Sequence, residues 1–134
     1  MISYMTFGKL VRAGGMDVNE DVMVTFQYDP EGDPLAISLL FEADFLPFVI
    51  TWTFSRDLLV QAVDSPFIVG EGDVRLRNDG EDLLICLKSP DGHADLTTPI
   101  DEARQFLDEA AAEADRSSPD FEAAADEFLK EVLG

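Results

Sequence analysis

The chain has 134 residues, and 9 Lys and Arg against 28 Asp and Glu give it a formal net charge of −19 at pH 7. A surface this acidic repels phosphate backbones and anionic lipid headgroups, so we expect no nucleic acid partner and no membrane insertion. The length predicts a single domain over residues 1–134. Because 46% of the residues are hydrophobic and ten are Phe, the composition excludes a disordered chain.

Cysteine and histidine each occur once, which excludes a disulfide framework and a Cys/His zinc cluster. Cys86 lies in the apolar run 83–87 and is predicted to be a buried, reduced thiol, as in a cytosolic protein. Residues 1–5 lack the basic start of a secretion signal, and no apolar run approaches the roughly 18 residues of a membrane-spanning helix. We therefore expect a cytoplasmic protein.

Residues up to about Thr98 alternate between apolar and polar side chains, which is the period of strands with one buried face. Turn sequences at 29–34, 78–80 and 90–92 separate these runs, and loops this short join antiparallel neighbours. The pattern predicts about seven antiparallel strands, the first of them within 2–12. The clearest run places four large side chains on one inward face: Phe48, Ile50, Trp52 and Phe54.

Helices are predicted at three places. Ser55 can cap a short helix over 56–63, whose apolar residues fall on one face. After Thr98 the apolar period changes to 3.6, with Thr98 as the N-cap and Pro99 at the first helical position. A second C-terminal helix begins at the start signal of Ser118.

These elements predict an α+β fold class. We expect a twisted antiparallel sheet of about seven strands, with one short inserted helix and two C-terminal helices. Residues 1–98 are mostly strands in this prediction, and residues 99–134 are helical. Because an apolar stripe persists between the many acidic residues of 99–134, we expect these helices to pack with their charges in solvent.

No group of residues has the pattern of a catalytic, cofactor-binding or metal site. His93 lies in a turn with no Ser or Cys placed to use it as a base, which is typical of a surface histidine. Asp29, Glu31 and Asp33 alternate like calcium ligands, but the glycine comes at the fourth position and no Glu stands at the twelfth. We expect no enzyme, cofactor or metal. A hydrolase with a carboxylate pair stays open, because the sequence does not place carboxylates in space.

Several short motifs follow one another at defined spacings. One of them runs from Trp52 to Leu59 and reads W-T-F-S-R-D-L-L. The others are Tyr28-Asp29, Asp33-Pro34-Leu35-Ala36-Ile37, Phe41, Pro66, Gly70-Glu71-Gly72-Asp73-Val74-Arg75, Leu87-Lys88-Ser89-Pro90-Asp91-Gly92-His93-Ala94, Pro99 and Phe106-Leu107. Their order and spacing, from about Tyr28 to Leu107, resemble the SsgA-like family of actinomycete sporulation and cell-division proteins, whose signature is W-x-F-[AS]-R-D-L-L.

The resemblance implies a non-enzymatic regulator that controls where and when septa form during sporulation. It implies protein partners: the tubulin-like division protein FtsZ, another SsgA-like protein, and further copies of the chain in a homotrimer at the cell septum. The implied fold is an antiparallel sheet with helices, similar to the Whirly-type single-stranded nucleic-acid binders. A shared fold does not by itself confer that activity.

Arg56 is the candidate partner contact within the signature. Trp52 and the two leucines of the signature are expected in the core. Arg56 is one of nine cations and can either pair internally or mark a contact surface, and a structural role is favoured. Single-stranded nucleic-acid binding by a Whirly-like fold remains the alternative function, although Arg75 and Arg77 form the only basic pair and stand among acids.

Overall fold

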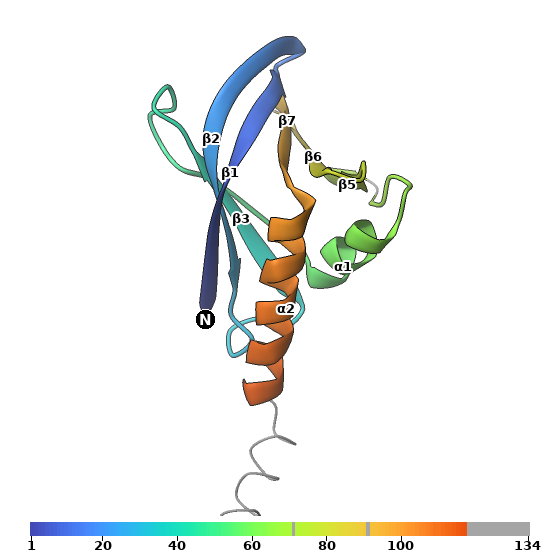
Figure 1. Cartoon of the computed structure of the whole chain (residues 1–134). Helices are drawn as coiled ribbons and strands as arrows, with labels where there is room; N and C mark the ends of the chain where they lie inside the picture. The colour runs from blue at the N-terminus through green and yellow to red at the C-terminus, as the bar shows by residue number, and fades with distance from the viewer. Residues whose placement is uncertain (71, 91, 118–134) are drawn as a thin grey trace, which may run out of the picture.

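The computed structural model describes residues 1–70, 72–90 and 92–117, which form one antiparallel sheet and two helices (Figure 1). Each strand buries one set of alternate side chains, as the period of two requires. The strands are β1 (Ile2–Ala13), β2 (Met16–Tyr28), β3 (Ala36–Glu42), β4 (Ile50–Ser55), β5 (Val74–Asn78), β6 (Asp82–Ser89) and β7 (Gly92–Pro99).

The sheet consists of two meanders joined by one strand pairing. Its strand order is β4-β3-β2-β1-β7-β6-β5, so β1–β4 form a first meander and β5–β7 form a second. The two meanders join where Lys9 to Ala13 of β1 pair with Thr97 to Ala94 of β7. The part of β1 before Lys9 pairs with β2 alone. A bulge between Leu10 and Arg12 bends β1 at this join.

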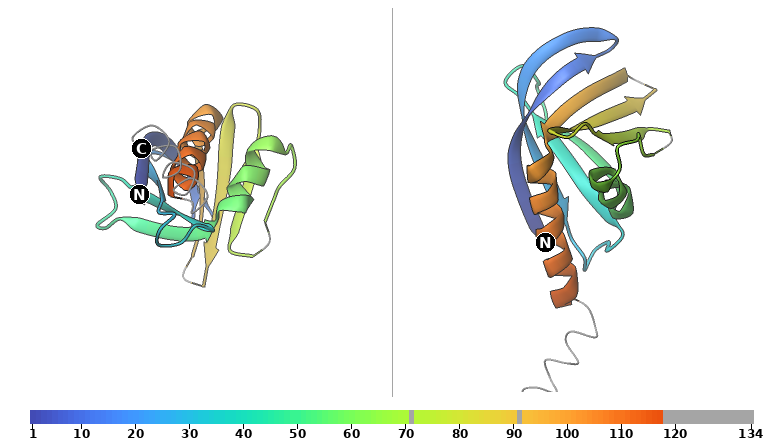
Figure 2. Two further views of the ribbon diagram at one scale, coloured as in Figure 1. Left: turned by 90° about the horizontal axis from the view of Figure 1, so that it is seen from below. Right: turned by 45° about the vertical axis from the view of Figure 1, so that its right-hand side comes forward.

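Both helices lie on the inner face of the curled sheet (Figure 2). The helix α1 (Arg56–Asp64) connects β4 at one edge of the sheet to β5 at the other. The helix α2 (Ile100–Ser117) follows β7 and contacts β1, β6, β7 and α1. Arg104 of α2 donates to the Asp64 carboxylate at 3.1 Å and to the Val63 carbonyl, which fastens the two helices together.

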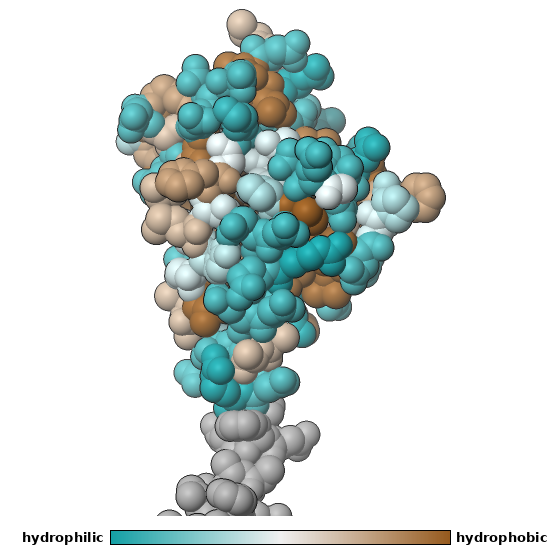
Figure 3. Space-filling model, viewed as in Figure 1, coloured by the Kyte–Doolittle hydropathy of each residue, from teal (hydrophilic) through white to brown (hydrophobic). Residues whose placement is uncertain are grey.

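The core lies between the inner face of the sheet and the helices. At its centre the rings of Phe26 on β2 and Phe106 on α2 stack with centroids 5.1 Å apart. Near the edge of the core, the Tyr4 hydroxyl of β1 donates to the Glu102 carboxylate of α2, and this bond is the main cause that raises the pKa of Tyr4 to about 12. The outward side of α2 is hydrophilic (Figure 3), as expected for an amphipathic helix.

The predicted α+β class with seven antiparallel strands is confirmed, and so is the short inserted helix. The helix ends one residue after the predicted range 56–63. Ser55 occupies the N-cap position, but its side chain makes no capping hydrogen bond. The second C-terminal helix predicted from Ser118 lies outside the described residues. The likeness to Whirly-type proteins stays a prediction.

The predicted cap of the C-terminal helix is wrong. Thr98 pairs with Leu83 in the sheet and is 1% exposed, and among the described residues its hydroxyl has no hydrogen-bond partner. The strand continues through Pro99, and the helix begins at Ile100. Proline is tolerated there because β1 has already separated from β7, so no ladder bond needs the missing N–H.

The inward placement of Phe48 is also wrong. Its side chain is 65% exposed, and β4 begins at Ile50, where pairing with Phe41 starts. Residues before Ile50 have no partner strand in the described ladder, so the alternation that continues through Phe48 does not correspond to a buried face. Of the four predicted residues, Phe54 is buried and the two between are half-buried.

Candidate partner-binding surfaces

The signature segment forms the end of β4 and the first turn of α1. Leu59 is fully buried, and Trp52 and Leu58 are half-buried against the core. The helix starts here because the extended backbone of Ser55 leads into a run of good helix formers, with Asp57 in the first turn near the positive end of the helix dipole. Leu59 is therefore in the core as predicted, whereas Trp52 and Leu58 are only partly buried at its border.

Arg56 lies against the buried ring of Tyr28. Its Nη1 donates to the Tyr28 hydroxyl at 3.0 Å, and its guanidinium carbon is 5.3 Å from the ring centroid. The hydroxyl donates in turn to the Pro34 carbonyl at 3.0 Å, while the Tyr28 residue is only 1% exposed. Arg56 thus links α1 to the loop before β3 through a buried phenol. Its role as a partner contact stays a prediction.

Two exposed apolar side chains flank Arg56. Leu35 is 75% exposed, and its carbonyl accepts the backbone N–H of Arg56 at 2.8 Å. Val60 follows Arg56 by one helical turn on the same side of α1 and is 42% exposed. We call Leu35, Arg56 and Val60 the signature surface. An arginine between apolar side chains is a composition typical of protein interfaces.

The outer face of the first meander is uncharged along its middle. The strand register places Met5, Thr25, Leu40 and Thr51 in one row across four strands. Met5 and Phe7 are 63% and 72% exposed. Figure 3 shows residues of hydrophobic character on the side of the molecule where β1 and β2 run. We call this the neutral face; its members are Met5, Phe7, Met23, Thr25, Leu40 and Thr51, and Glu42, at the end of the row of Phe7 and Met23, marks its charged border.

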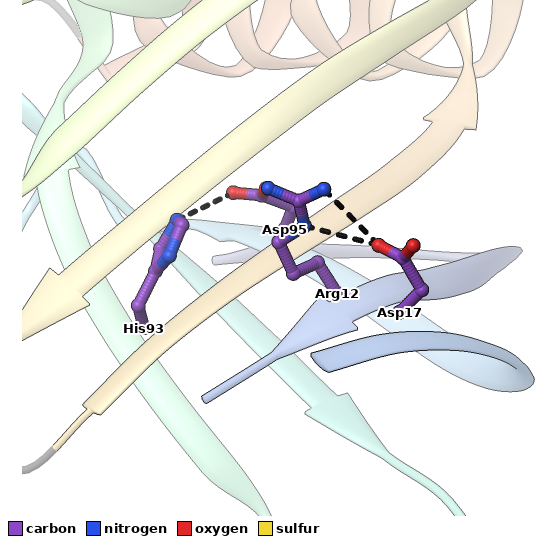
Figure 4. Close-up of polar contacts among 4 residues, drawn as sticks. All are labelled: Arg12, Asp17, His93 and Asp95. Atoms are coloured by element: carbon purple, nitrogen blue, oxygen red, sulfur yellow. Dashed lines mark hydrogen bonds and ion pairs between the residues drawn. The ribbon is translucent and has the colours of Figure 1, made fainter. Parts of the chain in front are cut away.

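Charged residues line the outer face at the join of the meanders (Figure 4). Arg12 donates to the Asp17 carboxylate at 3.1 and 3.3 Å, and the His93 Nε2 lies 2.8 Å from the Asp95 Oδ1. Arg12 pairs across the strands with Asp95, so the charges alternate along one row. His93, which the sequence predicts to be a surface residue in a turn, lies in β7, and its side chain is 38% exposed.

Cys86 is not buried as predicted. Leu83, Ile85 and Leu87 face inward, so the alternation of β6 turns Cys86 to the outer face, where it is half-buried beside Asp95. Desolvation, and then a hydrogen bond to Asp95, raise the pKa of the thiol to about 11. A thiol with so little thiolate is a poor nucleophile at neutral pH.

The described parts of the chain contain no cluster of three or more His, Cys, Asp or Glu residues that could hold a metal ion. No helix in 1–70, 72–90 or 92–117 is long and apolar enough to cross a membrane. Three exposed surfaces differ in character: the signature surface combines a cation with apolar side chains, the neutral face has apolar and uncharged polar side chains, and the join is charged.

Comparison with known proteins identifies the family of the chain. The sequence profile described as "Streptomyces sporulation and cell division protein, SsgA" matches residues 22–117. The sporulation-specific cell division protein SsgB of Frankia casuarinae is 38% identical over 103 residues, which are 74% of this chain and 68% of that protein. The matched segment covers 50% to 68% of the length of such curated relatives.

Two solved structures have a similar fold. The structure of SsgB from Streptomyces coelicolor has a TM-score of 0.63 at 29% identity and covers 82% of this chain and 83% of that one. The SsgA-like sporulation-specific cell division protein of Thermobifida fusca has a TM-score of 0.67 at 24% identity, covering 97% and 94% of the two chains. Together with the profile match over most of the sequence, these likenesses show that the chain belongs to the SsgA family of sporulation and cell-division proteins.

Proposed function

We propose that this chain is a non-enzymatic adaptor in sporulation-linked cell division. It acts through protein contacts at the cell septum, where it helps to place the division site and to recruit the tubulin-like protein FtsZ. The observation that carries the proposal is the family membership, because the relatives are named sporulation-specific cell division proteins. Its site of action is the cytoplasmic side of the septum.

The signature surface is the proposed contact for the division partner. Its support is the exposure of Leu35 and Val60 on either side of a half-buried cation. Arg56 has neighbours that hold it in place, so its remaining exposed surface is presented in a fixed orientation. A partner with a carboxylate beside an apolar side chain fits this surface.

The test compares Arg56→Glu with Tyr28→Phe in co-purification with FtsZ and in imaging of septa. Both variants remove the bond between the guanidinium and the phenol, but only Arg56→Glu reverses the charge. We expect Arg56→Glu to lose the partner and Tyr28→Phe to retain it, after thermal melts have shown that both are folded. Equal loss in both variants would assign Arg56 a purely structural role.

A different outcome addresses the functional proposal as a whole. If the wild-type chain captures no division protein and never reaches a septum in the native host, the proposal fails. Retention of the partner by both variants places the contact elsewhere on the surface. A wild type that localises while Arg56→Glu does not is the expected result.

The neutral face is the proposed contact between copies in a homotrimer. Each copy carries a formal charge of −19, so copies repel one another except where a face lacks charge. Met5 and Phe7 provide exposed apolar area in that face. Light scattering on a sizing column should give about three times 14.8 kDa. Phe7→Glu should give monomers, while Phe67→Glu, at a phenylalanine of similar exposure after α1, should leave the trimer intact.

A further inference from the structure

The outer face of the second meander carries three cations that form no ion pair with the described residues. Arg75 and Arg77 project from β5 and Lys88 from β6, and none lies within ion-pair distance of a carboxylate among residues 1–70, 72–90 and 92–117. By contrast, Lys9, Arg104 and Arg116 each have a carboxylate at 2.8–3.1 Å. Because these three side chains are exposed and have no intramolecular ion pair among the described residues, they are available to a negatively charged partner.

These cations line a cavity with apolar walls. The cavity holds about 340 Å³ and lies between β5, β6, β7 and the segment after α1. Leu84, opposite Arg77 on β6, forms part of its floor, and the rim includes Ile68, which is 61% exposed. The Asp95 carboxylate in this cavity is engaged by His93 at 2.8 Å and by the Cys86 thiol. The cavity therefore presents unpaired positive charge beside apolar surface.

The spacing of the two arginines matches an extended chain. Arg75 and Arg77 are two residues apart on one strand, so their side chains leave the same face about 7 Å apart. Alternate residues of an extended peptide have the same separation. Two carboxylates at alternate positions can each meet one guanidinium, in the paired geometry that arginine favours. An apolar side chain nearby can then cover Leu84 and Ile68.

A nucleic acid fits this surface less well. Base stacking needs aromatic side chains, and the described lining residues of the cavity include none besides the His93 ring. A phosphate backbone must also approach a molecule whose net charge is −19, with three unpaired cations to attract it. A short acidic peptide brings fewer negative charges and uses the apolar lining as well.

We propose that the outer face of β5–β7 is a docking site for an extended acidic segment of a partner protein. The segment has two carboxylates at alternate positions, bound by Arg75 and Arg77, and an apolar side chain seated between Leu84 and Ile68. This site does not include the signature surface, and it adds a second contact to the proposed adaptor. Its test requires no division protein, so it can fail or succeed independently of the proposed function.

The experiment selects peptides from a random dodecapeptide display library against the full chain. We expect the enriched peptides to carry acidic residues at alternate positions next to an apolar residue. Synthetic copies of these peptides should bind the Arg75→Glu/Arg77→Glu variant at least roughly tenfold more weakly, because like charges then face each other. Lys9→Glu/Arg116→Glu is the matched control: it makes the same change in net charge at cations that already have carboxylate partners, and it should bind normally.

Four results would overturn the proposal. Three of them are no enrichment at all, enrichment of peptides without acidic residues, and equal binding by the two double variants; the fourth comes from competition with a nucleic acid. Labelled oligothymidylate serves as the competitor at low salt. If it binds the wild type and displaces the selected peptide, the surface is a nucleic-acid site instead. Thermal melts of both double variants establish that the comparison is between folded proteins.

Discussion

The two meanders share one core but differ on their outer faces. The first meander presents the neutral face, with Met5 and Phe7 exposed. The second presents Arg75, Arg77 and Lys88 around an apolar cavity. Inward residues of both halves are nearly uniform, because burial requires apolar side chains there. The difference shows that the fold constrains one side of each strand and leaves the other free to carry function.

The two outer faces also differ in charge, and this difference determines which kind of partner each can bind. In a protein of net charge −19, an uncharged face lowers the repulsion between identical copies, and the exposed cations of β5 and β6 attract acidic segments of other proteins. The two outer faces therefore suit different kinds of contact. Four predictions test whether the halves are one folded unit with separable surfaces.

The largest effect is expected for Phe106→Ala. Phe106 is fully buried and stacks on Phe26 of the first meander, while its helix also contacts β6 and β7 of the second. The loss of this ring should lower the free energy of unfolding by about 3–5 kcal/mol. Urea titration followed by Trp52 fluorescence reports on the first meander, and protection of Cys86 from alkylation reports on the second.

Both probes should shift together, and the exposed neighbour Gln105→Ala should change stability by less than about 0.5 kcal/mol. A shift in Trp52 fluorescence without a shift in Cys86 protection would separate the halves into independent units. That outcome would contradict the prediction that the two meanders unfold together as one cooperative unit.

A smaller effect is expected for Gly8→Ala, at the point where β1 leaves β7. A Cβ at Gly8 would overlap with the backbone oxygen of Thr97, so the two strands would have to move apart. We expect destabilisation by about 1–3 kcal/mol, measured by urea titration. Gly92→Ala is the control because a Cβ there meets no atom within 4 Å. Equal free energies of unfolding for the two variants would show that the join tolerates separation of the strands.

The third prediction concerns the thiol of the second meander. The pKa of Cys86 is raised from 9.0 to about 11, so less thiolate is present, and alkylation at pH 8 should be about 100-fold slower than for an ordinary thiol. The rate should keep rising with pH up to about 11. Asp95→Asn should lower this pKa and speed the reaction, while Arg75→Gln should raise it and slow the reaction. A rate in native protein equal to that in urea would contradict the prediction.

The smallest effects are expected on the outer faces themselves. Met5→Ser and Arg77→Gln each replace an exposed side chain, one from each meander. Each should change the free energy of unfolding of the separate chain by less than about 0.5 kcal/mol, as determined by urea titration at low protein concentration. A loss above about 2 kcal/mol at either position would show that the outer faces are needed for folding and are not free for contacts.

The strands could be predicted because alternation records which side chains are buried. Where a strand begins could not, since Phe48 continues the pattern of β4 but has no partner strand. Thr98 resembled a helix cap because its neighbours carry a start signal, whereas long-range pairing with Leu83 keeps it in the sheet. Arg56 could be singled out from the signature, but its contact with Tyr28 depends on packing between distant segments.

The outer faces could not be predicted from local patterns. Met5 and Phe7 belong to a run in which Tyr4 and Ile2 are also apolar, so the sequence does not tell which set faces outward. The sequence does show that β1 has apolar side chains on both of its faces, so an exposed apolar set on one face could have been predicted, but not which set it is. The alignment of Arg75 with Cys86 and Asp95 needs the register of three strands. Such rows exist only once the sheet has formed.

One of the two strands that pair with β1 is β7, which is translated long after β1, and this order affects folding during synthesis on the ribosome. The first meander is complete at Ser55, but the stretch from Lys9 to Ala13 pairs with β7, whose residues 94–97 are translated later. At bacterial elongation rates this interval lasts on the order of 2–8 seconds, during which one edge of the strand is open to other nascent chains. Lys9 and Arg12 lie within this stretch, and charged side chains on an open edge discourage pairing with a wrong strand.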